Sequence, residues 1–321
     1  MTAPKKVLLL KPRGFCAGVV RAIDVVNIAL DTFGPPIYVR REIVHNRHVV
    51  QELAEKGAIF VREVAEVPAG QRVVFSAHGI SPAVRAGAKE RGLKVIDATC
   101  PLVTKVHLEA IRFAKKGYSL LLVGHPDHEE VEGTLGEAPE VTQVVSSADD
   151  VAGLSVPDPD HVAYLTQTTL SLSEAGKIIS ALKARFPNIQ APPSQDICYA
   201  TENRQVAVRN TSPKADLVLV VGSKNSSNSN RLVEVARGLG TASYLIDDAR
   251  SIDSAWLNGV DTVSVTAGAS APEVLVTEVL TRLAEFGYAD VEEVESVLED
   301  VHFALPRDMT TSTAPAAALP R

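Results

Sequence analysis

The sequence contains little cysteine. Only three of its 321 residues are cysteines, Cys16, Cys100 and Cys198, and the closest two are 84 positions apart. The chain therefore lacks the closely spaced cysteine pairs typical of structural zinc sites, and an odd number of distant thiols does not indicate a disulfide framework. Each thiol could be a small buried apolar residue, a nucleophile or a metal ligand.

Long apolar runs and an excess of basic residues are also missing. The amino end, MTAPKKVLLLKPRGF, has only four consecutive apolar residues before Lys11, too few for a signal-peptide core or a membrane span. The net charge is −7 and the charged residues are spread along the chain, which does not indicate a surface for nucleic acid. We therefore expect a cytoplasmic protein that binds neither membranes nor nucleic acids.

Common nucleotide-binding and zinc patterns are absent or incomplete. The sequence has no GxxxxGK[ST] segment, and GLGTAS lacks the third glycine of GxGxxG, so electrons for any redox reaction would come from outside rather than from bound nicotinamide. Two H-x-x-H pairs, His45 with His48 and His125 with His128, lack the HExxH pattern and indicate zinc only weakly.

Strand-like runs rich in Val, Ile and Leu alternate with segments of helical length, which is typical of parallel α/β proteins. KKVLLL leads to Cys16 and a predicted helix over 17–30, and LKVID leads to Cys100 and a predicted helix over 101–116. Cys198 also precedes a predicted helix, after a weaker strand. A helix start lowers the pKa of a thiol, so the pattern predicts reactive thiolates.

Polar residues recur at nearly fixed distances from the three cysteines. His45, His128 and Ser226 follow them by 29, 28 and 28 residues, and His78, Thr168 and Ser270 by 62, 68 and 72. This repetition predicts three related α/β units with small, mainly parallel sheets, at residues 1–99, 100–196 and 197–285. Because ligands bind beyond the carboxyl ends of parallel strands, all nine positions could face one central cavity.

The remaining residues, 286–321, are predicted to form a C-terminal extension. Its acidic segment DVEEVESVLED reads as a solvated face, and PRDMTTSTAPAAALPR, which has few large apolar residues, as a disordered tail.

Three thiols that meet in one cavity could hold zinc or an iron-sulfur cluster. A cluster accepts widely separated ligands, and three thiolates would leave one iron of a four-iron cluster without a cysteine, free to act as a Lewis acid. The histidines and the hydroxyl-rich loops GSKNSSNSN and AGASAP supply donors for an anion. Glu130 and Glu132 offer carboxylates beside His128, either as proton donors or as ordinary surface charge.

Nine motifs together resemble one enzyme family, the 4-hydroxy-3-methylbut-2-enyl diphosphate reductases that complete the methylerythritol phosphate route to isoprenoids. The resemblance covers about residues 7–285 and is carried by PRGFCAGVVRAI, REIVHN, SAHGISP, DATCPLVTKVH, HEEVEGT, TQTTLS, DICYATENRQ, GSKNSSNSNRL and AGASAP. It implies a pseudo-threefold trefoil of α/β units around a central cluster cavity. It also implies reductive removal of the substrate hydroxyl, giving isopentenyl and dimethylallyl diphosphate.

The resemblance also implies roles for individual residues. Cys16, Cys100 and Cys198 would hold one 4Fe-4S cluster per chain, and Glu130, Thr168 and His128 would form the catalytic set, with Glu130 as proton donor and Thr168 placing the substrate hydroxyl. His128 is preferred to His125 because it keeps its fixed offset to VEGT. The residues expected to bind the diphosphate are His45, His78, His128, Ser226, Ser227, Asn228 and Ser270.

Partners and alternatives complete the prediction. The expected electron donor is an external ferredoxin or flavodoxin, and the expected assembly is a monomer or weak dimer. A zinc-dependent hydrolase of a phosphorylated metabolite would contain zinc and no sulfide. A cluster-bearing redox sensor or anion-binding module would use the same thiolates without needing Glu130 or Thr168.

Overall fold

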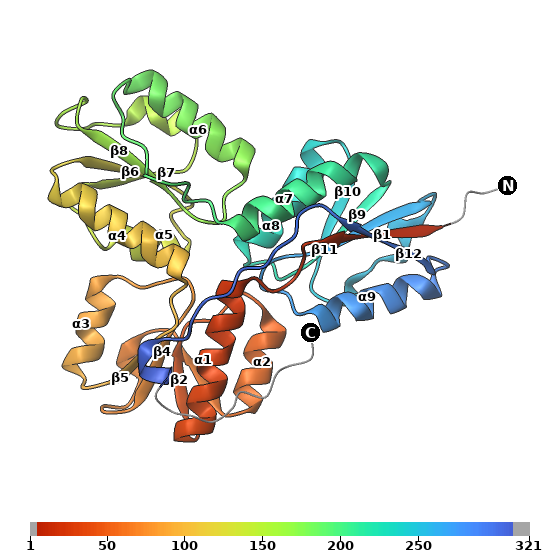
Figure 1. Cartoon of the computed structure of the whole chain (residues 1–321), viewed down its shortest axis with the longest axis horizontal. Coiled ribbons are helices and arrows are strands. Elements are labelled where there is room, and N and C mark those ends of the chain that lie inside the picture. The colour runs from red at the N-terminus through yellow and green to blue at the C-terminus, as the bar shows by residue number, and fades with distance from the viewer. Residues whose placement is uncertain (1–4, 311–321) are drawn as a thin grey trace.

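The computed structural model describes residues 5–310 and contains three β-sheets with helices packed against them (Figure 1). The first sheet has the strand order β3-β2-β4-β5, with β2 at Ile37–Arg40, β3 at Ala58–Val61, β4 at Arg72–Phe75 and β5 at Lys94–Asp97. The second has the order β7-β6-β8, with β6 at Ser119–Val123, β7 at Thr142–Val145 and β8 at Val162–Thr166.

The third sheet has five strands in the order β10-β9-β11-β1-β12. They span β1 Lys6–Lys11, β9 Leu217–Val221, β10 Ala242–Ile246, β11 Thr262–Ala267 and β12 Asp290–Glu295. Every strand pairing in the three sheets is parallel. The predicted fold class, an α/β protein with three small parallel sheets, is confirmed.

The helices follow the strands as parallel connections require. Their bounds are α1 Ala17–Phe33, α2 Arg47–Glu55, α3 Pro82–Glu90, α4 Pro101–Lys115, α5 Glu129–Leu135, α6 Leu172–Arg185, α7 Tyr199–Thr211, α8 Ser227–Gly238, α9 Glu273–Glu285 and α10 Arg307–Thr310. The helices predicted at 17–30 and 101–116 correspond to α1 and α4.

Burial on both faces of each sheet explains why its strands are continuously apolar. All five residues of β9, LVLVV, are buried, and alternate residues of that strand belong to two separate apolar clusters. The second sheet likewise separates two clusters, one around Leu121 and one around Leu120. Each sheet with its helices is therefore a layered unit with its own core.

The first strand departs from the predicted organisation. The predicted first unit, residues 1–99, includes β1, but this strand pairs with β11 and β12 in the third sheet. β1 therefore joins the third unit from the other end of the chain and lies between β11 and β12. The expected boundaries near residues 100 and 197 stay a prediction. The segment before Cys198 contributes only an isolated bridge, between Ala163 and Gln190.

The C-terminal extension is more ordered than its composition suggests. Its acidic part forms β12, whose residues are mostly exposed, and residues 307–310 of the predicted tail form α10. Met309 is buried in the apolar cluster of the first unit, because a lone large apolar side chain is stabilised by leaving water. The rest of the predicted tail, residues 311–321, lies outside the described residues.

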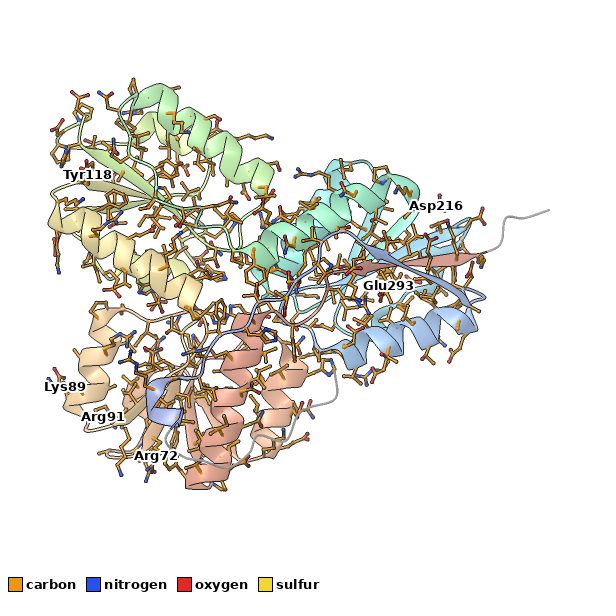
Figure 2. The ribbon with its side chains drawn as sticks, in the orientation of Figure 1. Arg72, Lys89, Arg91, Tyr118, Asp216 and Glu293 are labelled. Carbon is orange, nitrogen blue, oxygen red and sulfur yellow. The ribbon has the colours of Figure 1, made fainter. Side chains whose placement is uncertain are left out.

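The three units form three lobes around a common centre, and α1, α4 and α7 each point one end towards it (Figure 1). Side chains that lie on the outer parts of the lobes include Arg72, Lys89, Arg91, Tyr118, Asp216 and Glu293 (Figure 2). Among residues 5–310, no helix is both long and apolar enough to cross a membrane.

Candidate active site

The three cysteines lie where the sequence predicts, each immediately before the first residue of a helix. Cys16 precedes α1, Cys100 precedes α4 and Cys198 precedes α7. Their backbone N–H groups donate to equivalent loops, those that follow β11, β4 and β8. The acceptors are the carbonyl groups of Ala269 for Cys16 at 3.1 Å, Ala77 for Cys100 at 3.0 Å and Thr168 for Cys198 at 3.0 Å. The repeat is thus visible in the backbone hydrogen bonds.

The three cysteines form no disulfide, and the space around their sulfur atoms suits a ligand larger than a single metal ion. All three cysteines are free. A Cβ added to Gly18 would lie 2.7 Å from Cys100 Sγ and 3.8 Å from Cys16 Sγ, so glycine keeps the space beside both sulfur atoms open. Within the described part of the chain, the three sulfur atoms do not form a set lying within 4.8 Å of one another, as ligands of a single ion would. Thiolates that converge at wider spacing fit an iron-sulfur cluster.

Burial opposes the lowering of pKa that a helix start predicts for two of these thiols. Burial raises the pKa of Cys100 to about 12 and that of Cys198 to about 11, and the neighbouring Cys16 adds to both effects. Desolvation outweighs the helix N-terminus because the thiolate would be buried near a second thiolate. A bound cation is what such thiols require in order to deprotonate.

One cavity at the centre of the three units collects the predicted site residues. All twelve line it, together with apolar side chains such as Val19 and Val103. The twelve are Cys16, His45, His78, Cys100, His128, Glu130, Thr168, Cys198, Ser226, Ser227, Asn228 and Ser270. Residues separated by more than 250 positions are brought together because each follows a strand or begins a helix at the same end of its unit.

Glu130 is the most deeply buried carboxyl group in the cavity. Its side chain is 2% exposed and accepts hydrogen bonds from the Thr168 N–H at 2.6 Å and the Thr168 hydroxyl at 2.9 Å. Burial raises the pKa of Glu130 to about 7, and the two hydrogen bonds from Thr168 only partly oppose that rise. A carboxyl group with this pKa holds a proton near neutral pH and can donate it.

Three histidines form a compact group beside the hydroxyl-rich loops. The His45 and His78 rings stack with centroids 3.9 Å apart, and His128 meets both edge-on at 5.5 and 6.0 Å. Burial and the proximity of the other two rings lower the pKa of His128 to about 3, and similar effects lower the pKa of His45. His45 and His128 are therefore neutral at pH 7, and an incoming anion would favour their protonated forms.

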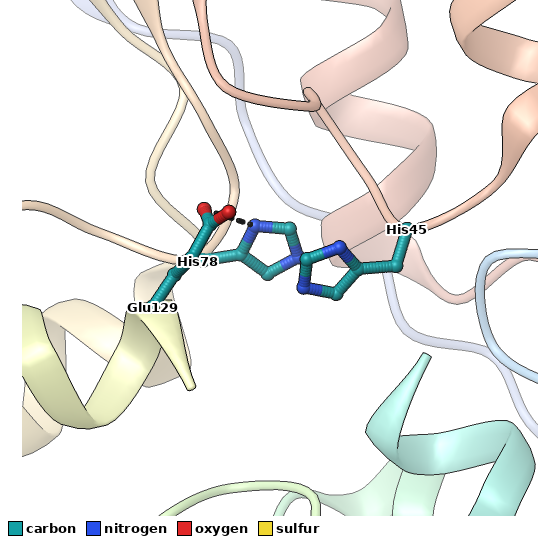
Figure 3. Close-up of side chains that lie close together, drawn as sticks. All are labelled: His45, His78 and Glu129. Carbon is teal, nitrogen blue, oxygen red and sulfur yellow. Dashed lines mark ion pairs between the residues drawn. The ribbon is translucent and has the colours of Figure 1, made fainter. Parts of the chain in front are cut away.

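Glu129 stands beside this group, with one oxygen 3.4 Å from His78 Nδ1 (Figure 3). Burial raises its pKa, but its interactions with His78 and His45 outweigh burial and lower it to about 2. His45, His78 and Glu129 also have ligand atoms within 4.8 Å of one another, so they could hold a single metal ion. If the histidines bind an anion rather than a metal ion, the Glu129 carboxylate has a different part, which is to orient the His78 ring.

Ser226 and Asn228 line the cavity at the start of α8 and form part of a wall rich in serine. Ser226 precedes the helix and accepts from the Ser229 N–H at 3.3 Å. Asn228 accepts from the Ala269 N–H at 2.9 Å and donates to the Thr201 hydroxyl at 3.1 Å. These contacts fix the wall, and the positive end of the α8 dipole makes it suitable for an anion.

Ser227 and Ser270 complete that wall. The Ser270 hydroxyl donates to the His45 carbonyl at 2.9 Å, which connects the serine wall to the histidine group. Ser227 accepts from the Thr169 hydroxyl at 3.0 Å. Thr169 and Thr201 line the cavity as well, and sequence reasoning missed both. Thr169 stands next to Thr168 within TQTTLS, and Thr201 lies three residues after Cys198, so their motifs were the available signal.

The H-x-x-H pairs and Glu132, which were weaker signals in the sequence, do not all reach the cavity. Each H-x-x-H pair sends one histidine into the cavity, His45 or His128, while His48 lies 3.7 Å from Asp248 and His125 does not line the cavity. Glu132, the second carboxylate considered, pairs with Arg41 at 2.7 Å and has a half-exposed side chain. The H-x-x-H pairs therefore do not form a zinc site.

The fold and this cavity define an α/β enzyme with a central anion site beside three converging thiols. The family model described as LytB protein matches residues 7–284. The 4-hydroxy-3-methylbut-2-enyl diphosphate reductase of Leifsonia xyli is 58% identical over 311 residues, which is 97% of this chain and 92% of that protein.

Two solved structures of reductases with the same kind of name are also similar to this chain. The E-1-hydroxy-2-methyl-but-2-enyl-4-diphosphate reductase of Plasmodium falciparum superposes with a TM-score of 0.93 at 40% identity, over 96% of this chain and 98% of that one. An (E)-4-hydroxy-3-methyl-but-2-enyl diphosphate reductase, described as the terminal enzyme of the non-mevalonate pathway, superposes with a TM-score of 0.62 at 31% identity, over 88% and 99%. The chain belongs to the 4-hydroxy-3-methylbut-2-enyl diphosphate reductase family. The enzyme class expected from the nine motifs is confirmed.

Proposed function

We propose that the central cavity reductively removes the allylic hydroxyl of (E)-4-hydroxy-3-methylbut-2-enyl diphosphate and releases isopentenyl and dimethylallyl diphosphate. The observation that carries the proposal is the convergence of three free thiols, a protonatable buried carboxyl group and an anion-binding wall in one cavity. The reaction consumes two electrons and two protons, and the hydroxyl leaves as water.

Cys16, Cys100 and Cys198 would hold one 4Fe-4S cluster per chain. Their positions at helix starts and the space beside Gly18 support this assignment. When bound, the cluster supplies electrons singly and offers an iron without a cysteine as a Lewis acid for the substrate hydroxyl. The low iron affinity of a protonated thiol means that loading would release protons from the three cysteines.

The histidine group and the serine wall would bind the diphosphate. All of them line the cavity: His45, His78, His128, Ser226, Ser227, Asn228 and Ser270. Because the Nδ1 atom of His128 accepts from the Glu130 N–H at 3.2 Å, its Nε2 atom carries the proton that can be donated to a phosphate oxygen. Binding a dianion would raise the pKa of His45 and His128 and draw in protons, which strengthens the hold on the phosphate.

Glu130 would deliver the proton to the departing oxygen. Thr168 touches both carboxyl oxygens of Glu130 and lines the cavity, so its hydroxyl can place the substrate hydroxyl within reach of Glu130. The same contact can relay a proton: the Thr168 hydroxyl passes its hydrogen to the leaving oxygen and takes one from Glu130.

The need for electrons and for reduced cysteines indicates the electron donor and the cellular location. An external one-electron donor of the ferredoxin or flavodoxin class would reduce the enzyme, since the sequence offers no nicotinamide site. Free cysteines that serve as metal ligands suit a reducing compartment, which supports a cytoplasmic location. A monomer or weak dimer stays the predicted assembly.

Anaerobic purification followed by iron, acid-labile sulfide and zinc analysis tests the proposal first. About four irons per chain with a matching amount of sulfide are expected, because three cysteines then leave one iron open. Zinc without sulfide would contradict the reductive mechanism and would favour a hydrolase with metal at His45, His78 and Glu129. A loaded cluster without turnover of the substrate by a strong one-electron reductant would instead favour a redox sensor.

A further inference from the structure

Each of the three helices that begin after a cysteine carries a basic residue at a matching position. Arg21 on α1, Lys105 on α4 and Arg204 on α7 follow their cysteines by five, five and six residues. Helical side chains lean towards the helix N-terminus, so the three cations lie near the cysteine end of each helix. None of them lines the cavity, and the proposed mechanism does not use them.

Two of these cations reach the loop before a different cysteine. Arg21 Nη1 donates to the carbonyl oxygen of Thr99 at 3.0 Å, one residue before Cys100. Arg204 Nη2 donates to the carbonyl oxygen of Gly14 at 2.7 Å, two residues before Cys16. Each bond therefore joins the helix that follows one cysteine to the backbone that leads into another.

Lys105 makes the third connection. Its ammonium group donates to the carbonyl oxygens of Ser194 at 2.9 Å and Gln195 at 2.8 Å, and to Asp196 Oδ1 at 3.1 Å. These residues lead into Cys198. The Asp196 side chain is fully buried, and its other oxygen accepts from the backbone of the second sheet, from the Thr166 N–H at 2.9 Å. The segment before Cys198, which lacks a strand, is thus held by α4.

The three connections close a circle in one direction. The α1 helix holds the approach to Cys100, α4 holds the approach to Cys198, and α7 holds the approach to Cys16. A chance contact does not repeat in the same direction, and within one residue of the same offset, in all three units. We propose that a ring of three cationic side chains holds the three thiols at their spacing through these hydrogen bonds: Arg21, Lys105 and Arg204. Their positive charges also offset the negative charge of the group that the thiolates bind. This inference rests on the proposed assignment of the cysteines as cluster ligands.

The burial and the positive charge of these side chains indicate that they stabilise the thiolates electrostatically as well as positioning them. Arg204 is completely buried and pairs with Glu299 at 3.1 Å, a residue of the C-terminal extension. Arg21 donates to the residue directly before Cys100, which brings its positive charge close to that sulfur atom. Three thiolates in a buried cavity are stabilised by fixed positive groups nearby, and one more negative charge arrives each time the group is reduced.

The test compares the loaded wild-type enzyme with Lys105→Met and Arg21→Met, which remove the cation and its donors. Lys105→Arg and Arg21→Lys retain them, and Lys115→Met alters an exposed lysine on the same helix as Lys105. After anaerobic reconstitution, iron and sulfide per chain are measured, together with the rate at which an iron chelator removes the iron and the midpoint potential of the cluster. Circular dichroism checks folding.

Both methionine variants should lose iron to the chelator roughly tenfold faster, as supporting residues around a metal typically require. Their midpoint potentials should fall, since the added electron loses a nearby positive charge, and the conservative variants should restore both values. A merely structural role would not move the potential. Arg21→Met carries the test if Lys105→Met does not fold. Wild-type chelation rates and potentials in both methionine variants would overturn the inference, whereas a wild-type protein without iron and sulfide would overturn the proposed function instead.

Discussion

Replacing Glu130 by glutamine tests the proton path most directly. The carboxyl group is 2% exposed, is held by two hydrogen bonds from Thr168, and has a pKa raised to about 7 by burial. Glutamine keeps the size and the bond to the Thr168 N–H but has no proton to give. Turnover should fall by roughly 100-fold to 10,000-fold, the range for loss of a general acid, with iron content and substrate affinity close to wild type.

The pKa also sets the pH dependence. A proton donor with a pKa of about 7 is charged and inactive above that pH, so wild-type turnover should fall by about tenfold per pH unit when protonation limits the rate. The folded-state pKa lies above the ordinary value of 4.5, so the fold favours the neutral acid. The raised pKa of Glu130 therefore adds to the free energy of unfolding in full below pH 4.5, and this contribution is lost as the pH rises through about 7. The contribution is roughly 3 kcal/mol.

The assay is anaerobic steady-state turnover with a strong artificial one-electron reductant from about pH 6 to 9, paired with urea unfolding of the same samples. Glu130→Gln should lack the alkaline fall in turnover and should gain unfolding free energy relative to wild type at the upper end of this range. Glu132→Gln, on the same helix and paired with Arg41 outside the cavity, is the matched control and should behave as wild type. Turnover of Glu130→Gln that keeps both the wild-type rate and the wild-type pH profile would refute the reasoning.

Three further changes probe the metal and anion sites. Cys100→Ser should leave the purified protein short of iron and sulfide, because serine is a poor iron ligand at neutral pH, and a full complement would contradict its role. Gly18→Ala should also reduce iron content, since the added Cβ would lie 2.7 Å from Cys100 Sγ, while Gly176→Ala, which has open space, should not; equal iron in the two variants would contradict the crowding argument. Ser227→Ala should raise KM roughly tenfold or more with a smaller change in kcat, as expected for one lost bond to a charged group. An unchanged KM would remove Ser227 from the diphosphate site.

Much of the candidate site was predictable because its residues lie in local motifs with strong backbone preferences. Pro101 suits the first turn of a helix, which indicated that α4 begins directly after Cys100. Apolar runs such as LVLVV predicted buried parallel strands, and the polar residues just beyond them had to meet at the carboxyl ends. The fold class and the residues at matched offsets therefore followed from local signals repeated three times, whereas Ser227 and Asn228 were expected through the family resemblance.

Other features depend on contacts between residues far apart in the chain. No local signal distinguishes a β1 that pairs with β2 from one that pairs with β11, and strand pairing is decided by which edge the folded units leave open. The choice between Glu130 and Glu132 is also a matter of burial, since both follow His128 on one short helix and only Glu130 faces Thr168.

The class of fold, the repeat and most residues that line the cavity are predictable from the amino-acid sequence, because these depend on periodicity and motifs. The protonation and the long-range contacts of those residues depend on packing in the folded chain. Packing raised the pKa of Cys100 and Cys198 where helix starts alone predicted a lower value, since desolvation depends on everything packed around a thiol. It also joined Arg21, Lys105 and Arg204 to the approaches of three distant cysteines, because hydrogen-bond partners separated by up to 190 positions are chosen by packing and not by local sequence.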